Sequence, residues 1–371
     1  MFAHDVLKTL YSPIKAFQEI VKKPDVKGPL LILALILIIT AGLQYASASK
    51  ISDEEPMTNR DEWTESTAWI PQWASNGEPT RDPDKNASVH VGNYSIASSV
   101  VNSTYIWMKL TEVGSFNCSP NTGYERLSFW IKGKSQNGML EDPNATLKLF
   151  SDNSNDYFKL DFGDELSNSS DEWSIVKVDL GPDGEGWERV GSPNWENVAG
   201  VEFALAWSVP ANLTMKIDDL YFAKFVPLTK YFFTGWFSSL MMSALSFFFH
   251  WGVYGGILLL VVKVFGEKVG SWKALFVVVG YLFSVRIVYL LVTVVLMPIL
   301  PEVRLENLAQ IWYSTLPYQT ILYFSFVTDI WMAALCTIAV RFFYTFTWKK
   351  AIGITVLASL LNFTLRPFIP I

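Results

Sequence analysis

Long runs of apolar residues constrain this chain more than any other feature. Residues 29–46 contain no charged side chain and are long enough to cross about 30 Å of hydrocarbon as a helix. Further apolar runs predict spans at 243–265, 274–300, 319–340 and 351–369. Only 17% of the residues are charged, against about 25% in soluble domains, which excludes a wholly soluble or disordered protein. The sequence therefore predicts an α-helical membrane bundle of five transmembrane helices.

The first apolar run has two interpretations. The tripeptide at residues 46–48 resembles the small-residue cleavage site of a signal peptide. However, the 28 residues before the run are long for a signal peptide and include Asp5, Glu19 and Asp25. We therefore expect residues 29–47 to be retained as the first transmembrane helix.

Basic residues near the ends of the spans predict the orientation, because Lys and Arg favour the cytoplasmic side. On the expected cytoplasmic side lie Lys8, Lys15, Lys22, Lys23, Lys27, Lys263, Lys268, Lys273, Arg341, Lys349 and Lys350. Residues 50–224 instead hold 28 acids and 14 bases, a net charge of −14. We expect a multi-pass cell-membrane protein with a cytoplasmic segment at 1–28, an extracytoplasmic segment at 48–228 and a membrane domain at 229–371.

The extracytoplasmic segment reads as an all-β sandwich. Apolar and polar residues alternate, which is typical of half-buried strands, at 127–133, 146–150, 157–162, 173–180, 201–207 and 213–222. In the last of these the apolar parity changes at Asp218 and Asp219, which predicts a β-bulge there. About 180 residues of short strands predict one jelly-roll sandwich, inserted between helices 1 and 2.

Several side chains of this segment are candidates for surface chemistry. Possible glycosylation sites of the Asn-X-Ser/Thr type are Asn86, Asn93, Asn102, Asn117, Asn144, Asn168 and Asn212. The alternative is that they are unmodified polar turns. Among nine Trp we expect most in the core, and Trp187 and Trp195 to be exposed for stacking on a sugar, because they flank a loop rich in Gly and Pro. Cys118 is expected to be a free thiol.

The organisation resembles the Yip (Ypt-interacting-protein) domain family of five-span membrane proteins. The stretches that carry the resemblance are LYSPIKAFQEIVKKPDVKGPLLIL (10–33), FGEKVGSWKALFVVVGYLFSV (265–285) and FVTDIWMAALCTIAVRFFYTFTWKKAIGITVLA (326–358). The inserted segment looks like a galactose-binding-like or carbohydrate-module jelly roll in YERLSFWIKG (124–133) and MKIDDLYF (215–222).

A resemblance to eukaryotic Yip members would imply contacts with small GTPases in vesicle traffic. The chain departs from those members in two places. Their acidic-aromatic segment before the first span is absent, and Val285 stands where those members have Pro. The Gly280-Tyr281 pair matches theirs. The combination is more similar to an archaeal-like relative, whose task the family does not imply.

Two opposite charges inside predicted spans are the sharpest candidates in the membrane domain. Arg286 lies in the span at 274–300 and Asp329 in the span at 319–340. A lone charge at the bilayer centre costs at least about 2.5–3.5 kcal/mol, which favours pairing between adjacent antiparallel spans. The pair is either structural or part of a pathway for an ion, a proton or a lipid headgroup.

The stretch 12–23 predicts an amphipathic helix, with Ser12 as N-cap and Pro13 at its first position. Its apolar side chains share one side at helical spacing, and Lys15, Lys22 and Lys23 lie elsewhere. We expect an interfacial helix held against anionic lipids, or otherwise a docking site for a cytoplasmic partner.

The sequence offers no catalytic constellation, no metal-ligand motif and no cofactor motif. Oxygen-rich acidic loops could hold Ca²⁺, but no twelve-residue EF-hand loop is present, and we expect a solvated acidic surface instead. We expect a non-enzymatic protein that displays its sandwich for binding or assembly, with the lipid bilayer, a glycan, an envelope polymer or an envelope protein as partners. Homo- or hetero-oligomers are compatible with this expectation, and nucleic acid is not expected. The alternatives are a transporter or channel-like protein that uses Arg286 and Asp329, and a membrane-organising scaffold.

Overall fold

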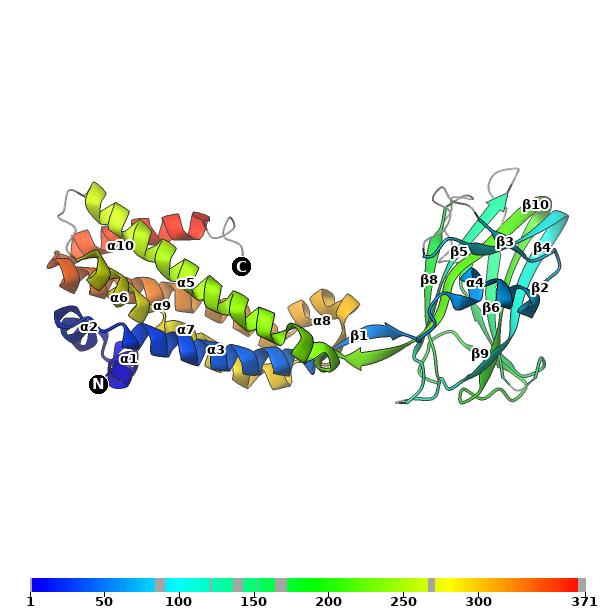
Figure 1. The fold of residues 1–371 in the computed structure, drawn as a ribbon, viewed down its shortest axis with the longest axis horizontal. Helices are drawn as coiled ribbons and strands as arrows, with labels where there is room; N and C mark the ends of the chain where they lie inside the picture. Colours follow the sequence, from blue (N-terminus) through cyan, green and yellow to red (C-terminus); the bar gives the residue numbers. More distant parts are fainter. Residues whose placement is uncertain are drawn as a thin grey trace. The chain divides into compact units, whose positions relative to one another are not determined.

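The computed structural model of the chain describes residues 2–83, 91–120, 122–135, 143–151, 153–163, 172–265 and 271–365. The chain divides into two compact units (Figure 1). The helical unit comprises residues 1–53 and 227–371, and the β unit comprises residues 54–226. The sequence analysis places the corresponding boundaries at 48 and 228.

The helical unit is built from helices connected by short loops. They are α1 (Phe2–Tyr11), α2 (Pro13–Lys22), α3 (Lys27–Ala48), α5 (Phe232–Val264), α6 (Trp272–Leu282), α7 (Ser284–Leu296), α8 (Leu308–Ser314), α9 (Leu316–Tyr344) and α10 (Trp348–Leu365). Among the described residues, four stretches are long and apolar enough to cross a membrane: Lys27–Ala48, Leu228–Val264, Trp272–Ile299 and Leu316–Tyr344. Helix α10, the expected fifth span, has 18 residues and is not among these four.

Helices α3, α5, α7 and α9 run alongside one another (Figure 1), with contacts of α3 to α5 and α7, and of α7 to α9. Glycine allows α3 and α6 to approach closely. A Cβ on Gly280 would lie 2.6 Å from the Pro29 ring. Trp251 of α5 fixes the other side of α6, because its Nε1 donates a hydrogen bond of 2.7 Å to the Phe276 carbonyl. These contacts make one buried core of the helical unit.

The span expected at 274–300 contains a break. Helix α6 ends at Leu282 and α7 begins at Ser284, so the chain bends out of regular helix at Phe283. There the Arg286 amide bonds to the Phe283 carbonyl, three residues back, which is the tighter 3₁₀ spacing. The break lies directly before Arg286.

Helix α2 begins at Pro13 directly after Ser12, although the Ser12 side chain makes no capping bond. Its apolar face is covered by protein: Phe17 and Ile20 are buried in the core of the helical unit, where α2 contacts α9. The expectation that this face lies against lipid is therefore wrong for these residues. The three lysines of the prediction, Lys15, Lys22 and Lys23, are exposed, and their binding to lipid stays a prediction.

The β unit is a large antiparallel sheet with two short helical segments. Its strands are β2 (Trp73–Ser75), β3 (Thr80–Asp82), β4 (Ser95–Phe116), β5 (Arg126–Ser135), β6 (Asn144–Phe150), β7 (Tyr157–Asp161), β8 (Ser174–Asp179), β9 (Glu188–Val190) and β10 (Val198–Pro227). Strand β1 (Ile51–Pro56) leads into the unit, followed by α4 (Glu62–Glu65) and a 3₁₀ segment at Thr67–Gln72. Strands β2, β3, β4 and β9 are additions to the strands expected from the sequence.

The two longest strands, β4 and β10, organise this sheet. They pair antiparallel over almost the whole of β4 and over Val198–Ile217 of β10, with register shifts between Ala206 and Leu213. The first part of β10 also pairs with β6, and its second part pairs with β5. The two parts correspond to the strands expected at 201–207 and 213–222. Strand β10 therefore belongs to both halves of the sheet.

The halves face each other across one core. Phe129 lies in β5 and Phe203 in the first part of β10, two segments that do not pair, yet their ring centroids are 4.7 Å apart. Both side chains are fully buried, at 0% exposure. A contact of this kind between unpaired strands places the two rings between facing layers of a sandwich.

The bulge expected in the last strand is confirmed. The pairing of β10 with β5 shifts register between Asp218 and Tyr221, and Asp219 has a φ of 46°. The extra residue returns Leu220 and Phe222 to the core, where both are 0% exposed. It also buries the two adjacent carboxylates.

Candidate functional site

The outer surface of one half of the sheet carries aromatic side chains. In β4, Ile106, Met108 and Leu110 are each 0% exposed and point into the core. Successive side chains of a strand point to opposite faces, so Tyr105 and Trp107 lie on the outer face. Tyr105 is 39% exposed, and Trp107 is half-buried.

Small residues of β10 lie next to these rings. Ala204 is the cross-strand neighbour of Trp107, and Ala206 is the neighbour of Tyr105. Gly200 lies on the same outer face of β10, further along the strand. Cross-strand neighbours on one face are about 4.5–5.5 Å apart, so short side chains here leave space beside both aromatic rings.

Charged groups form the adjoining row. Glu202 is the neighbour of Lys109 in β4 and of Lys148 in β6. The Lys148 Nζ lies 2.6 Å from a Glu202 carboxylate oxygen, and the Lys109 Nζ lies 3.8 Å from the centroid of the Phe150 ring. Partial burial and the negative charge of Glu202 raise the pKa of Tyr105, so its hydroxyl stays protonated as a donor.

We call this surface the aromatic face. Its members are Tyr105, Trp107, Lys109, Lys148, Tyr157 and Glu202. Tyr157 joins from β7, where the Lys148 Nζ lies 5.4 Å from its ring centroid. Flat apolar rings beside charged hydrogen-bonding groups suit a ligand that has both C–H faces and hydroxyl groups.

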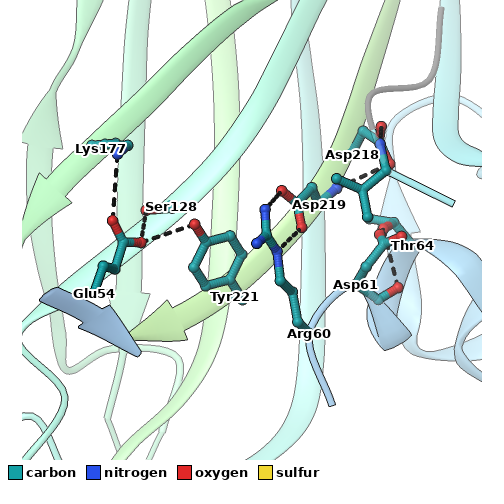
Figure 2. A network of polar contacts seen from close by, with 10 residues as sticks. Glu54, Arg60, Asp61, Thr64, Ser128, Lys177, Asp218, Asp219 and Tyr221 are labelled. Carbon is teal, nitrogen blue, oxygen red and sulfur yellow. Dashed lines mark hydrogen bonds and ion pairs between the residues drawn. The ribbon is translucent and has the colours of Figure 1, made fainter. Parts of the chain in front are cut away.

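A second cluster consists of buried acids at the bulge (Figure 2). Asp218 and Asp219 are 0% and 1% exposed. The Arg60 guanidinium is bidentate to Asp219: Nε donates to Oδ1 at 2.7 Å and a terminal nitrogen donates to Oδ2. The Arg60 guanidinium also lies over the Tyr221 ring, 4.5 Å from its centroid. Arg60 therefore compensates the charge that the bulge buries.

Asp61 is the third acid of this cluster, with an exposure of 5%. Burial raises its pKa to about 7, and the negative charges of Asp218 and Asp219 act in the same direction. The hydroxyl of Thr64 donates to Asp61 Oδ1 and opposes the rise (Figure 2). Asp61 is therefore close to half-protonated at neutral pH.

Glu54 forms the other end of the network in Figure 2. It accepts hydrogen bonds from the Tyr221 hydroxyl at 2.8 Å, from Ser128 at 3.2 Å and from Lys177 at 3.3 Å. Burial opposes ionisation, but the Tyr221 hydrogen bond and the Lys177 charge hold the pKa of Glu54 below its ordinary value. These contacts link β1 to β5, β8 and β10, which is a structural role.

Within the described ranges, no group of three or more His, Cys, Asp or Glu side chains is arranged as a metal site. The Ca²⁺ alternative for the acidic loops stays a prediction. Residues 84–90, which precede Val91, lie outside the described part of the chain.

The structure does not support Trp187 and Trp195 as an exposed stacking pair. Trp195 is 7% exposed and lies flat on Phe158, with ring centroids 3.7 Å apart. Trp187 packs edge-on against Trp195 at 5.4 Å, and its Nε1 donates to the Asp179 carbonyl. The loop folds back onto the sheet because its indole rings find apolar partners there.

The candidate glycosylation sites lie mostly at the surface. Asn93, Asn102, Asn117 and Asn144 are exposed, and Asn212 is half-buried. Asn86 and Asn168 fall outside the described residues. Asn144 is the cross-strand neighbour of Ala206, at one end of the aromatic face. Use of these sites stays a prediction.

Arg286 and Asp329 lie on the walls of the same hollows in the helical unit. A cavity of about 320 Å³ is lined by both, together with His250, Tyr254 and Asn362. A smaller cavity of about 100 Å³ is also lined by both. Arg286 and Asp329 therefore share the walls of two cavities, and an ion pair between them stays a prediction.

Trp107 is the residue that reasoning on the sequence missed. The sequence analysis expects it in the core with most other Trp, because it does not flank a turn-rich loop. The signal that would have found it is the strand parity: Ile106 and Met108 alternate as core residues, which places Trp107 on the other face.

No family model matches the chain, and no curated protein matches it, so neither comparison supports the Yip resemblance. Solved carbohydrate-binding modules resemble it in structure. A family 11 module of a cellulosomal cellulase of Clostridium thermocellum has 10% identity over 46% of this chain and 93% of its own, with a TM-score of 0.30. A family 28 module, specific for non-crystalline cellulose, has 10% identity over 45% and 94%, with a TM-score of 0.29. A family 30 module has 14% identity over 47% and 86%, with a TM-score of 0.30. Values this low assign no ligand to the present chain.

Proposed function

We propose that the β unit is a glycan-binding module that the helical unit anchors in a membrane. In this proposal the protein is non-enzymatic, and residues 48–228 face away from the cytoplasm. The ligand is an extracellular glycan or an envelope polymer that carries sugars.

The observation that carries the proposal is the aromatic face. Tyr105 and Trp107 offer rings next to a strand of small residues, where the C–H face of a sugar can lie against them. Glu202 and Lys148 lie in the adjoining row of side chains and can form hydrogen bonds with the hydroxyl groups of the sugar. Other side chains already fill the core of this unit, so the two aromatic rings on the outer face are not needed for its packing. Exposed apolar groups of this kind are typical of binding sites.

Four apolar helical stretches support the membrane part of the proposal. They have 22, 37, 28 and 29 residues, and about 20 residues are enough to cross the hydrocarbon core. The basic residues near their ends favour a cytoplasmic N-terminus. Cysteine-accessibility labelling of single-Cys variants in intact cells tests this orientation. If Asn153→Cys is labelled only after lysis, the β unit lies in the cytoplasm, and its proposed display outside the cell is wrong.

A glycan array probed with the full-length protein in detergent micelles tests the binding role. We expect Trp107→Ala to weaken binding more than tenfold, because aromatic anchors of this kind contribute about 2 kcal/mol or more. The matched control is Trp130→Ala, which removes a half-buried Trp of the same sandwich from β5. Equal loss in both variants, or no glycan bound by the wild type, would contradict the proposal.

A further inference from the structure

The helical unit contains a third cavity, besides the two that Arg286 shares with Asp329. This cavity has a volume of about 390 Å³ and lies between α3, α5 and α7. Arg286 of α7 and His250 of α5 are on its wall, and among the described lining residues there is no carboxylate. Asp329 is on the walls of the two cavities described above, which Arg286 also lines. Arg286 therefore borders cavities whose walls include a carboxylate and a cavity whose described lining carries no negative charge.

Hydroxyl groups line this cavity. Ser239, Ser243 and Ser246 of α5 are on the wall, with Thr40 of α3 and Tyr289 of α7. The three serines occupy positions i, i+4 and i+7 of α5, which is one face of a helix. With a rise of 1.5 Å per residue, they make a polar stripe of about 10 Å that leads toward His250 and Arg286.

The His250 ring is held in place at this end of the stripe. Its Nδ1 lies 2.7 Å from the Ser246 carbonyl oxygen, so Nδ1 carries a proton and donates it. This bond fixes the orientation of the ring. At the far end, the Gln44 side chain donates a hydrogen bond of 2.5 Å to the Ser239 hydroxyl, which ties α3 to α5.

Apolar side chains surround this polar stripe. Ile36, Phe247 and Leu290 line the same cavity. Met242 lines it too and is 51% exposed on the outer surface of α5, where Leu245 is 56% exposed. A ligand that fits has an anionic, hydrogen-bonding head for the interior and a hydrocarbon part for the exposed surface of α5.

We propose that this cavity binds the phosphate head of an anionic amphiphile, with Arg286 as its charge partner and the hydroxyls of Ser239 and Ser246 as hydrogen-bond donors; the Ser243 hydroxyl already donates to the Ser239 carbonyl. Arg presents a planar fork of donors that matches phosphate oxygens, and such charge-assisted bonds are stronger than neutral ones. The inference rests on the membrane placement proposed above. It does not depend on glycan binding, which concerns the other unit.

The test uses the purified full-length protein in a nonionic detergent. The melting temperature of the helical signal at 222 nm is followed during titration with phosphatidylglycerol, phosphatidylcholine or inorganic phosphate. We expect phosphatidylglycerol to raise the melting temperature, and Arg286→Gln to weaken this effect roughly 10- to 100-fold, as charged hydrogen bonds of about 1.5–3 kcal/mol imply. Asp329→Asn should keep or strengthen the effect, because it removes a negative charge near the guanidinium.

Two variants control the experiment. Lys263→Gln removes the same charge from an exposed residue near the end of α5; a loss as large as that of Arg286→Gln would mean general attraction of anionic lipid and overturn the proposal. Arg286→Lys keeps the charge without the fork, so it should bind with intermediate affinity and decides the matter if Arg286→Gln does not fold. An equal, Arg286-dependent shift with inorganic phosphate would identify a soluble phosphate as the source. No shift with any of the three ligands would refute the site.

Discussion

The ion pair between Arg60 and Asp219 provides the sharpest test of how the β unit is stabilised. Asp219 is 1% exposed, and the bidentate Arg60 guanidinium is its positively charged partner. We predict that Arg60→Ala strongly destabilises the β unit, because it leaves a buried carboxylate without compensation beside Asp218. The double variant Arg60→Leu/Asp219→Asn should recover most of the loss.

The expected magnitude follows from the geometry. Removing one partner of a buried pair costs about 3–5 kcal/mol, and the lower end applies because the Arg60 side chain is 42% exposed. Loss of the ring contact with Tyr221 adds about 0.5–1 kcal/mol. The sum, roughly 3.5–4 kcal/mol, corresponds to an increase of between about 300- and 1,000-fold in the opening constant.

Hydrogen exchange followed by mass spectrometry on the full-length protein measures this constant separately for peptides of β5 and β10. The control is Arg189→Ala, which removes an exposed arginine of β9 and should change exchange little. If Arg60→Ala changes exchange in β10 no more than Arg189→Ala does, or if the double variant is as unstable as Arg60→Ala, the compensation argument is wrong.

Three further predictions concern other residues. Because the pKa of Asp61 is raised to about 7, the folded β unit retains a proton that the unfolded chain loses near pH 4. The free energy of unfolding of the β unit should therefore fall as pH rises from 4 to 7. Denaturation measured across this pH range should show that Asp61→Asn removes the slope. Burial raises the pKa of the Cys118 thiol to about 12, so maleimide should label it at pH 8 only after unfolding, and labelling of native protein would contradict this burial. Gly280→Ala should lower the melting temperature of the helical unit by overpacking worth about 1–3 kcal/mol against Pro29, whereas Gly256→Ala, with open space around it, should not.

The sequence predicted the β unit best where side-chain parity was clear. The strands at 127–133 and 146–150 lie within β5 and β6, and the bulge at Asp218 and Asp219 followed from parity alone. Parity works because it depends on one local fact, that neighbouring side chains in a strand point to opposite faces. The same rule, applied to β4, would have identified Trp107.

The failures concern residues whose surroundings come from distant parts of the chain. Trp195 looked exposed because it follows a turn-rich loop, but Phe158 of β7 covers it. The apolar face of α2 was expected at the membrane surface, but Phe17 lies in the core of the helical unit, where α2 contacts α9. The sequence shows that such an apolar face must be buried. It contains no local signal of which other segment of the chain packs against it. The sequence contains no proline near Phe283 that would predict the break between α6 and α7.

Strand β10 has a consequence for how this protein is made. It is the last strand of the β unit along the chain, and it supplies central pairing partners to both halves of the sheet. Until the ribosome has delivered residues up to about 223, β5 and β6 therefore lack the neighbour that joins them. The β unit must wait for its final strand, which emerges immediately before α5. Completion of the sandwich and delivery of α5 are thus successive events of translation, and a stall between them would leave a half-built sheet with its edges open to aggregation.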